Sequence, residues 1–163
     1  MRTMLIVLIY AMFFLSGAAA LIYEVVWFRS LSLIFGGSHL AVTTVVSVFM
    51  GGLALGSYLI GKLASRFKRL LALYGLLELG IALAAGLFEL LMKVYPDIYI
   101  HLASLSPESP VYLSLIRVSF GTLAMIVPTT LMGGTLPVLS DFVSKDGGGV
   151  GRHLSILYGL NTL

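Results

Sequence analysis

The stretch ALIYEVVWFRSLSLIF, residues 20–35, decides how this chain is classified. An apolar run that starts near Met4 reaches the ~20 residues of a membrane crossing before it meets Glu24 and Arg29. The run then continues apolar to Phe35, which a cleaved signal peptide would not need. We therefore expect an uncleaved membrane helix that carries an acid and a base near one end.

The composition excludes a soluble domain. Hydrophobic residues make up 59% of the 163 residues and charged residues only 10%, whereas a soluble domain carries about 25% charged residues. The apolar runs are long and continuous, which favours helices over the short alternating strands of a barrel. The absence of cysteine removes disulfides, thiolate metal sites and cysteine nucleophiles. The predicted fold is all-α: a single membrane domain over residues 1–163, arranged as a polytopic helical bundle like half of a major facilitator transporter.

Long apolar segments predict four complete spans and a fifth that is incomplete. They cover residues 4–35, 40–60, 70–92, 111–136 and 152–163, with boundaries that are approximate. The polar stretch between the third and fourth spans contains three prolines and predicts a loop. Because the last segment is shorter than the ~20 residues of a crossing, we expect a fragment of a longer protein. A short interfacial helix at the C-terminus is the alternative.

Basic residues predict the orientation of the chain in the membrane. They gather in segments that the span order places on one side, namely Arg2, Lys62, Arg66, Lys68, Arg69, Lys145 and Arg152. Lysine and arginine are enriched in cytoplasmic loops. We therefore expect a multi-pass protein of a bacterial-type cytoplasmic (inner) membrane with a cytoplasmic N-terminus. The same placement argues against nucleic-acid binding as the reason for the net charge of +3.

Glu24 and Arg29 need partners on other helices. Five residues apart, they are separated by about 140° around a helix and do not face each other. We expect a structural ion pair from Glu24 to Arg117, which lies in the outer part of the fourth span, with Arg29 as the second base. Two other interpretations are a polar cavity or gate, and snorkelling of the charges to the lipid headgroups.

Glu78 lies about 12 Å into the third span at 1.5 Å per residue. No base lies at a matching offset on its own helix, whereas Glu89 has Lys93 four residues later and predicts a surface pair. An ionisable residue inside a membrane span is a functional-site hypothesis by default. The hypothesis is a cation or proton site formed by Glu78, Glu24 and Thr130. The alternative is a protonated, hydrogen-bonded carboxyl without a transport role.

The stretch PTTLMGGTLP, residues 128–137, predicts a broken helix. Pro128 and Pro137 flank Gly133 and Gly134, and transporters build sites from interrupted helices of this kind. A plain helix end near the inner surface is the alternative.

In the second span, the glycine spacing that starts at Gly52 favours helix packing within the chain over a dimer face.

The chain contains no pattern of a soluble enzyme. The three histidines are scattered at loop edges, so no metal site is expected. The glycines at 147–149 follow no strand and precede no phosphate-binding lysine, so we interpret them as a linker. No catalytic residue is predicted in this chain.

The stretch GKLASRFKRLL, residues 61–71, resembles the loop between the second and third helices of major facilitator transporters. The match is carried by Gly61, Arg66, Lys68 and Arg69. Ser65 replaces the usual acid of that loop, and Lys68 replaces its usual second glycine.

Four further stretches, together with the ending GRHLSILYGLNTL at 151–163, resemble the membrane-embedded spermidine synthase-like family. The four stretches are LIYEVVWFRSLSLIFGGS at 21–38, FMGGLALGSYLIGKLASR at 49–66, YGLLELGIAL at 74–83 and PTTLMGGTLPVLS at 128–140. In that family a half-transporter-like helical region precedes a cytoplasmic aminopropyltransferase domain. The resemblance implies a Rossmann-type domain that uses decarboxylated S-adenosylmethionine, but none of its motifs occur in these residues. It therefore implies no cofactor for this chain itself.

Three functional hypotheses follow. The first is a membrane domain that anchors, and passes polyamine-type cations to or from, a C-terminal soluble aminopropyltransferase domain of the same protein. The second is a half-unit of a major facilitator-like transporter, completed by a homodimer or by further helices. The third is a purely structural anchor in the lipid bilayer.

Overall fold

The chain folds into four long helices in the computed structural model, which describes residues 2–36, 39–106, 108–144, 155 and 159. The helices are α1 (Arg2–Phe35), α2 (His39–Ala64), α3 (Leu70–Ala103) and α4 (Pro110–Ser144). Each of them is long and apolar enough to cross a membrane. The prediction of an all-α, multi-pass membrane bundle is confirmed.

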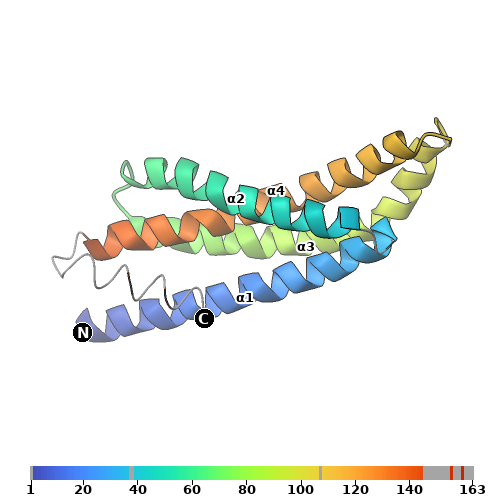
Figure 1. The fold of residues 1–163 in the computed structure, drawn as a ribbon. Coiled ribbons are helices and arrows are strands. Elements are labelled where there is room, and N and C mark those ends of the chain that lie inside the picture. Colours follow the sequence, from blue (N-terminus) through green and yellow to red (C-terminus); the bar gives the residue numbers. More distant parts are fainter. Residues whose placement is uncertain (1, 37–38, 107, 145–154, 156–158, 160–163) are drawn as a thin grey trace.

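Two helices extend beyond the predicted spans because prolines do not end them. α3 continues through Pro96 to Ala103, where a polar loop was expected, and α4 continues through Pro137 to Ser144. A proline removes one backbone hydrogen bond, and the neighbouring helices of a membrane bundle tolerate this loss. The last turns of α3 bend away from the first part of the helix (Figure 1), and Pro96, which lies inside α3, explains the bend. The predicted fifth span at 152–163 lies almost entirely outside the described residues.

α2 and α4 form the closest helix pair, and glycines allow their approach. A Cβ atom added to Gly52 would overlap Thr129, and one added to Gly56 would overlap the backbone carbonyl of Thr130. Gly133 lies in the same way against the backbone of Leu53. Because small residues let helix backbones come into contact, this face of α2 is used for packing within the chain.

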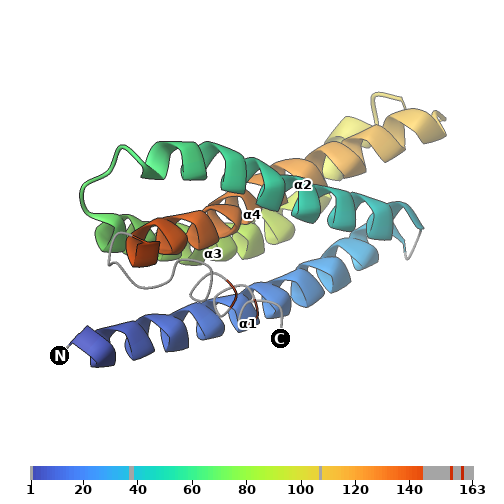
Figure 2. The same cartoon turned by 60° about the vertical axis from the view of Figure 1, so that its left-hand side comes forward.

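α1 is the most loosely attached helix. Figures 1 and 2 both show it running along one side of the unit formed by α2, α3 and α4. It contacts α2 far less than α4 does, and it contacts α3 and α4 at only a few positions. The buried side chains of α1 include Ile9, Phe13, Trp27 and Leu31, which lie in two groups separated by a segment of small residues.

The core consists of two hydrophobic clusters stacked along the bundle. One lies toward the end of the bundle that contains the α1–α2 turn and includes Trp27, Phe88 and Met125. The other lies toward the end that contains the α2–α3 loop and includes Phe13 and Leu139. On three of the helices, a polar residue lies between the part that belongs to one cluster and the part that belongs to the other. These residues are Ser16 of α1, Glu78 of α3 and Thr135 of α4. This polar layer within the apolar bundle is the feature that positions the candidate site.

Candidate functional site

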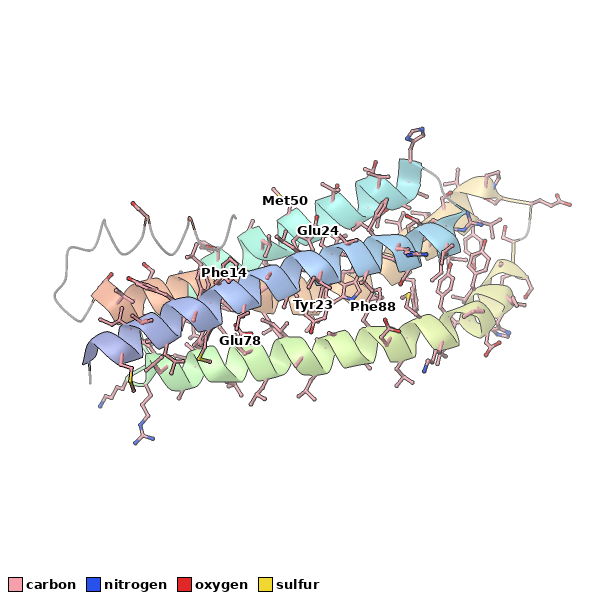
Figure 3. The ribbon with its side chains drawn as sticks, turned by 90° about the horizontal axis from the view of Figure 1, so that it is seen from below. Phe14, Tyr23, Glu24, Met50, Glu78 and Phe88 are labelled. Carbon is pink, nitrogen blue, oxygen red and sulfur yellow. The ribbon has the colours of Figure 1, made fainter. Side chains whose placement is uncertain are left out.

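Glu78 is held against α1 by a hydrogen bond from Ser16. The Ser16 hydroxyl donates to Glu78 Oε1 at 2.7 Å, across 62 positions of the sequence. Figure 3 shows Glu78 and Tyr23 in the strip between α1 and α3, and Glu24 on the other side of α1. Glu78 is half-buried, between the buried residues Leu77 and Ile81. The prediction had no partner for this carboxyl, and the structure supplies one from α1.

Two cavities meet at Ser16. The smaller one, of about 80 Å³, is lined by Ser16, Ala19, Ala20, Tyr23, Glu78, Ile81, Ala82 and Met132. The larger one, of about 130 Å³, is lined by Ser16, Gly17, Ala20, Leu21, Phe49, Leu53, Met132 and Thr135. A single water needs only about 10–15 Å³ of such space, so each cavity has room for several water-sized groups. Both are present because residues 16–20 of α1, SGAAA, carry only small side chains.

The smaller cavity is lined by a carboxyl group and a serine hydroxyl donor, and the rest of its wall is formed by apolar side chains and Tyr23. A charged side chain near the bilayer centre costs about 2.5–3.5 kcal/mol or more when it has no compensation. Ser16 compensates one carboxyl oxygen of Glu78. No basic side chain among the described residues forms an ion pair with Glu78. The site can therefore accept a proton on the carboxyl or a cation beside it.

Tyr74 adds a second hydroxyl near the carboxyl. It lies one helical turn before Glu78 and within electrostatic range of it. The Tyr74 side chain is buried, and its hydroxyl lies close enough to Glu78 and Ser16 to interact with both, although it forms no hydrogen bond of standard geometry with them. Because a buried hydroxyl without a partner costs free energy, Tyr74 is positioned to donate to Glu78 or to a bound water or ligand.

The structure does not form the predicted pair between Glu24 and Arg117. The Cζ atom of Phe35 lies 3.3 Å from a Cβ built on Gly121, so Gly121 is level with the end of α1. Glu24 lies 11 residues, about 16 Å, before Phe35, and Arg117 lies one turn beyond Gly121. The two charges are therefore too far apart along the bundle.

Arg117 instead contacts α3, and Arg29 faces outward. Arg117 Nη2 donates to the Tyr99 hydroxyl at 2.8 Å, and the guanidinium carbon lies 5.2 Å from the centre of the Tyr99 ring. Arg29 is exposed, Glu24 is half-buried, and neither forms an ion pair within the described part of the chain. The prediction of a structural ion pair among Glu24, Arg117 and Arg29 is therefore wrong. The helix register places Glu24 and Arg117 at different levels of the bundle, and Arg29 is exposed.

The predicted broken helix is continuous. Pro128, Gly133, Gly134 and Pro137 all lie inside α4, which remains helical from Pro110 to Ser144. The glycines serve packing: Gly133 contacts the α2 backbone, and Gly134 contacts the side chain of Ile60. Small residues in this stretch therefore bring α2 close without interrupting the helix.

The threonines of this stretch have different surroundings. The Thr130 hydroxyl donates to the Ile126 carbonyl at 2.6 Å, and Thr130 does not line either of the two cavities. Thr135 lines the larger cavity, with its hydroxyl donating to the Met132 carbonyl at 2.7 Å. The structure thus brings Ser16, Glu78 and Thr135 to the two cavities, and leaves Glu24 and Thr130 outside their linings.

Trp27 belongs to the core. Its side chain is 1% exposed. Tyr23 stacks on it with ring centres 5.4 Å apart, and Phe88 of α3 packs on it at 5.0 Å. Tyr23 of this aromatic group also lines the smaller cavity. It also connects α1 to α3, which α1 otherwise contacts at few positions.

The basic loop lies at the opposite end of the bundle from the α1–α2 turn. Arg66, Lys68 and Arg69 are exposed between α2 and α3, and the turn is closed by backbone hydrogen bonds from Arg66 to Leu63 and from Phe67 to Ala64. Gly61 lies within α2, and a Cβ added to it would lie 3.2 Å from Pro137. Gly61 is therefore a packing residue, and the three basic residues form a solvated turn.

Comparisons with known proteins add no relative: no protein-family model, no curated protein and no solved structure matches the chain. Within the described residues, no three histidine, aspartate or glutamate side chains are grouped as metal ligands. The chemistry of the site therefore rests on the carboxyl, the hydroxyls and the two cavities.

Proposed function

We propose that this chain is a membrane domain that binds a cation at Glu78. One observation carries the proposal: the Glu78 carboxyl is hydrogen-bonded to Ser16 and lines a cavity within the membrane-spanning part of the bundle. A carboxylate there is stabilised by a cation, because the surrounding apolar wall strengthens their electrostatic attraction. A proton on the carboxyl is the competing occupant.

The expected cation is of the polyamine type. An ammonium group is close to water in size, and the smaller cavity has room for several such groups. The larger cavity shares Ser16, Ala20 and Met132 with it and adds Phe49, Leu53 and Thr135. Polyamines alternate ammonium groups with methylene chains, and the two linings likewise combine polar groups with apolar ones. The resemblance to the membrane-embedded spermidine synthase-like family supports the same class of cation.

In this proposal the domain anchors a C-terminal aminopropyltransferase domain in a bacterial-type inner membrane and passes polyamine cations to or from it. The basic turn between α2 and α3 supports a cytoplasmic location for that loop and for the N-terminus.

The test is the thermal unfolding of the purified chain in detergent with and without spermidine. Spermidine is expected to raise the unfolding temperature of the wild type, and Glu78→Gln is expected to remove most of that rise. Ser16→Ala should reduce it, because one charge-assisted hydrogen bond that positions the carboxyl is lost.

Glu89→Gln is the matched control because Glu89 lies on the same helix but is exposed. Loss of the spermidine effect in both variants would indicate nonspecific attraction to acidic residues. An unchanged rise in Glu78→Gln would refute the proposed site.

A second candidate function is half of a major facilitator-like transporter. The observation that favours it is the position of both cavities along α1, the helix with the fewest contacts to the rest of the bundle. A movement of α1 would widen these cavities without disturbing the tight α2–α4 pair. Flux of labelled spermidine into proteoliposomes, abolished by Glu78→Gln, separates transport from binding alone.

A further inference from the structure

A second site lies at the other end of α3, around Arg117. Arg117 is half-buried and forms no ion pair among the described residues. Its Nη2 donates to Tyr99, but its Nε is buried without a hydrogen-bond partner. Because Arg Nε–H is only a donor, the missing partner must be an acceptor.

Tyr95 presents another buried donor beside this arginine. The Tyr95 ring packs on Tyr99 at 5.5 Å and on Phe120 at 4.4 Å between ring centres. The side chain is 4% exposed, and its Oη has no hydrogen-bond partner in the described part of the chain. Tyr99, which accepts from Arg117, keeps its own hydroxyl proton for donation. One positive charge, two donors without a partner (Arg117 Nε and Tyr95 Oη) and the hydroxyl proton of Tyr99 therefore belong to one cluster of packed side chains.

The ligand that would satisfy this charge and these donors is an oxyanion. A positive charge with several N–H and O–H donors matches a group that carries several oxygen acceptors and a negative charge. A carboxylate side chain would serve, but none of the described acidic residues pairs with Arg117. The Tyr99 ring covers one face of the guanidinium and restricts the approach of water from that side, which strengthens an interaction with an anion.

The depth of the site indicates where the anion comes from. Tyr95 lies 25 residues after Leu70, the first residue of α3. At 1.5 Å per residue this is about 38 Å, which exceeds the hydrocarbon thickness of about 30 Å. Because α3 begins beside the basic turn at one interface, Tyr95 and Arg117 lie in the headgroup layer of the opposite leaflet. The phosphate groups of phospholipids lie in that layer.

We propose that Arg117, Tyr95 and Tyr99 bind the phosphate of a phospholipid headgroup in the leaflet opposite the basic turn. The lipid phosphate neutralises the half-buried guanidinium, and on binding the surrounding side chains open to present Arg117 Nε and the Tyr95 hydroxyl, which are enclosed in this conformation. The bound lipid joins α3 to α4 beyond Pro96, where α3 bends away from its first part. This site is independent of the cation site at Glu78.

The test uses the purified, delipidated chain in a detergent without phosphate groups. Short-chain phosphatidylglycerol, short-chain phosphatidylcholine and inorganic phosphate are each titrated while the unfolding temperature is measured. Both lipids are expected to raise the temperature, whereas inorganic phosphate at equal concentration is not. Arg117→Gln is expected to weaken the apparent affinity for lipid by about tenfold or more, since a charge-assisted interaction is lost.

Two further variants keep the test decisive. Arg29→Gln is the control, because Arg29 is an exposed arginine near an end of α1. Tyr95→Phe retains the ring contacts and removes only the unpartnered hydroxyl, so it serves even if Arg117→Gln does not fold.

Each outcome decides one part of the proposal. A lipid effect that is equal in the wild type, Arg117→Gln and Tyr95→Phe would overturn the site. An Arg117-dependent rise with inorganic phosphate as large as that with lipid would overturn the phospholipid as its source and leave a soluble phosphate ion. A rise that depends on Arg117 and Tyr95 and requires lipid supports the proposal.

Discussion

Replacing Gly56 with alanine tests the α2–α4 contact on which the bundle depends. A Cβ atom at this position would overlap the Thr130 carbonyl oxygen and lie 3.1 Å from the backbone nitrogen of Gly134. Both obstacles are backbone atoms, so no side-chain rotation can relieve the overlap. The helices must separate, and dispersion contacts weaken along their whole interface.

The expected loss follows from two opposing terms. Overpacking costs about 1–3 kcal/mol, and the rigid backbone places this case near the upper value. Alanine returns about 1 kcal/mol relative to glycine through its higher helix propensity. The net destabilisation is therefore about 2 kcal/mol, which lowers the unfolding temperature of a domain of this size by roughly 4–8 °C.

The assay is thermal unfolding in detergent followed by circular dichroism, with Gly75→Ala as the control. A Cβ at Gly75 meets no atom within 4 Å, so this variant should be as stable as the wild type or slightly more stable. Equal unfolding temperatures for the Gly56 and Gly75 variants would refute the close contact. Size-exclusion chromatography tests the alternative that this face of α2 packs against a second copy of the chain. A Gly56 variant that dissociates a dimer without loss of monomer stability would contradict packing within the chain.

Two predictions concern the aromatic core and the orientation of the chain. Trp27→Ala should lower the free energy of unfolding by about 3–5 kcal/mol because Trp27 is 1% exposed, whereas Phe28→Ala should change it little because Phe28 is 37% exposed. Similar unfolding temperatures for the two variants would contradict the buried position of Trp27. Because the chain contains no cysteine, Ser65→Cys and Ser104→Cys can be labelled singly in bacterial cells with a membrane-impermeant maleimide. Labelling of Ser104→Cys from outside, and of Ser65→Cys only after lysis, is expected; the reverse pattern would refute the proposed orientation.

The existence of the four helices could be predicted because hydropathy alone determines whether a segment can cross a membrane. Their ends could not, because Pro96 and Pro137 suggest helix ends in isolation. In the bundle each proline removes one hydrogen bond, while the packing of α4 against α2 and α3 stabilises the helix on both sides. A proline in a membrane segment thus predicts a bend better than an end.

Glu78 could be identified from the sequence because its charge stands out in an apolar span. Ser16 could not be identified as its partner, because the two residues lie 62 positions apart and a serine gives little signal by itself. The sequence also does not determine the register between helices, and for this reason the expected pair of Glu24 and Arg117 is wrong. The distance of a residue from the start of its own helix can be calculated from the sequence. Which residue of another helix lies opposite it depends on the bends and tilts of both helices.

The segment SGAAA at 16–20 explains why the polar layer exists. On α1, Phe13 and Trp27 fill the two core clusters on either side of this segment. Large side chains at 16–20 would join the clusters into one core and bury the Glu78 carboxyl against carbon atoms alone. Small side chains instead leave two cavities and place a serine hydroxyl at hydrogen-bonding distance from the carboxyl. The small residues at 16–20 thus have a role in the packing: they leave space and a hydrogen-bond donor beside the Glu78 carboxyl, and they reduce the contacts of α1.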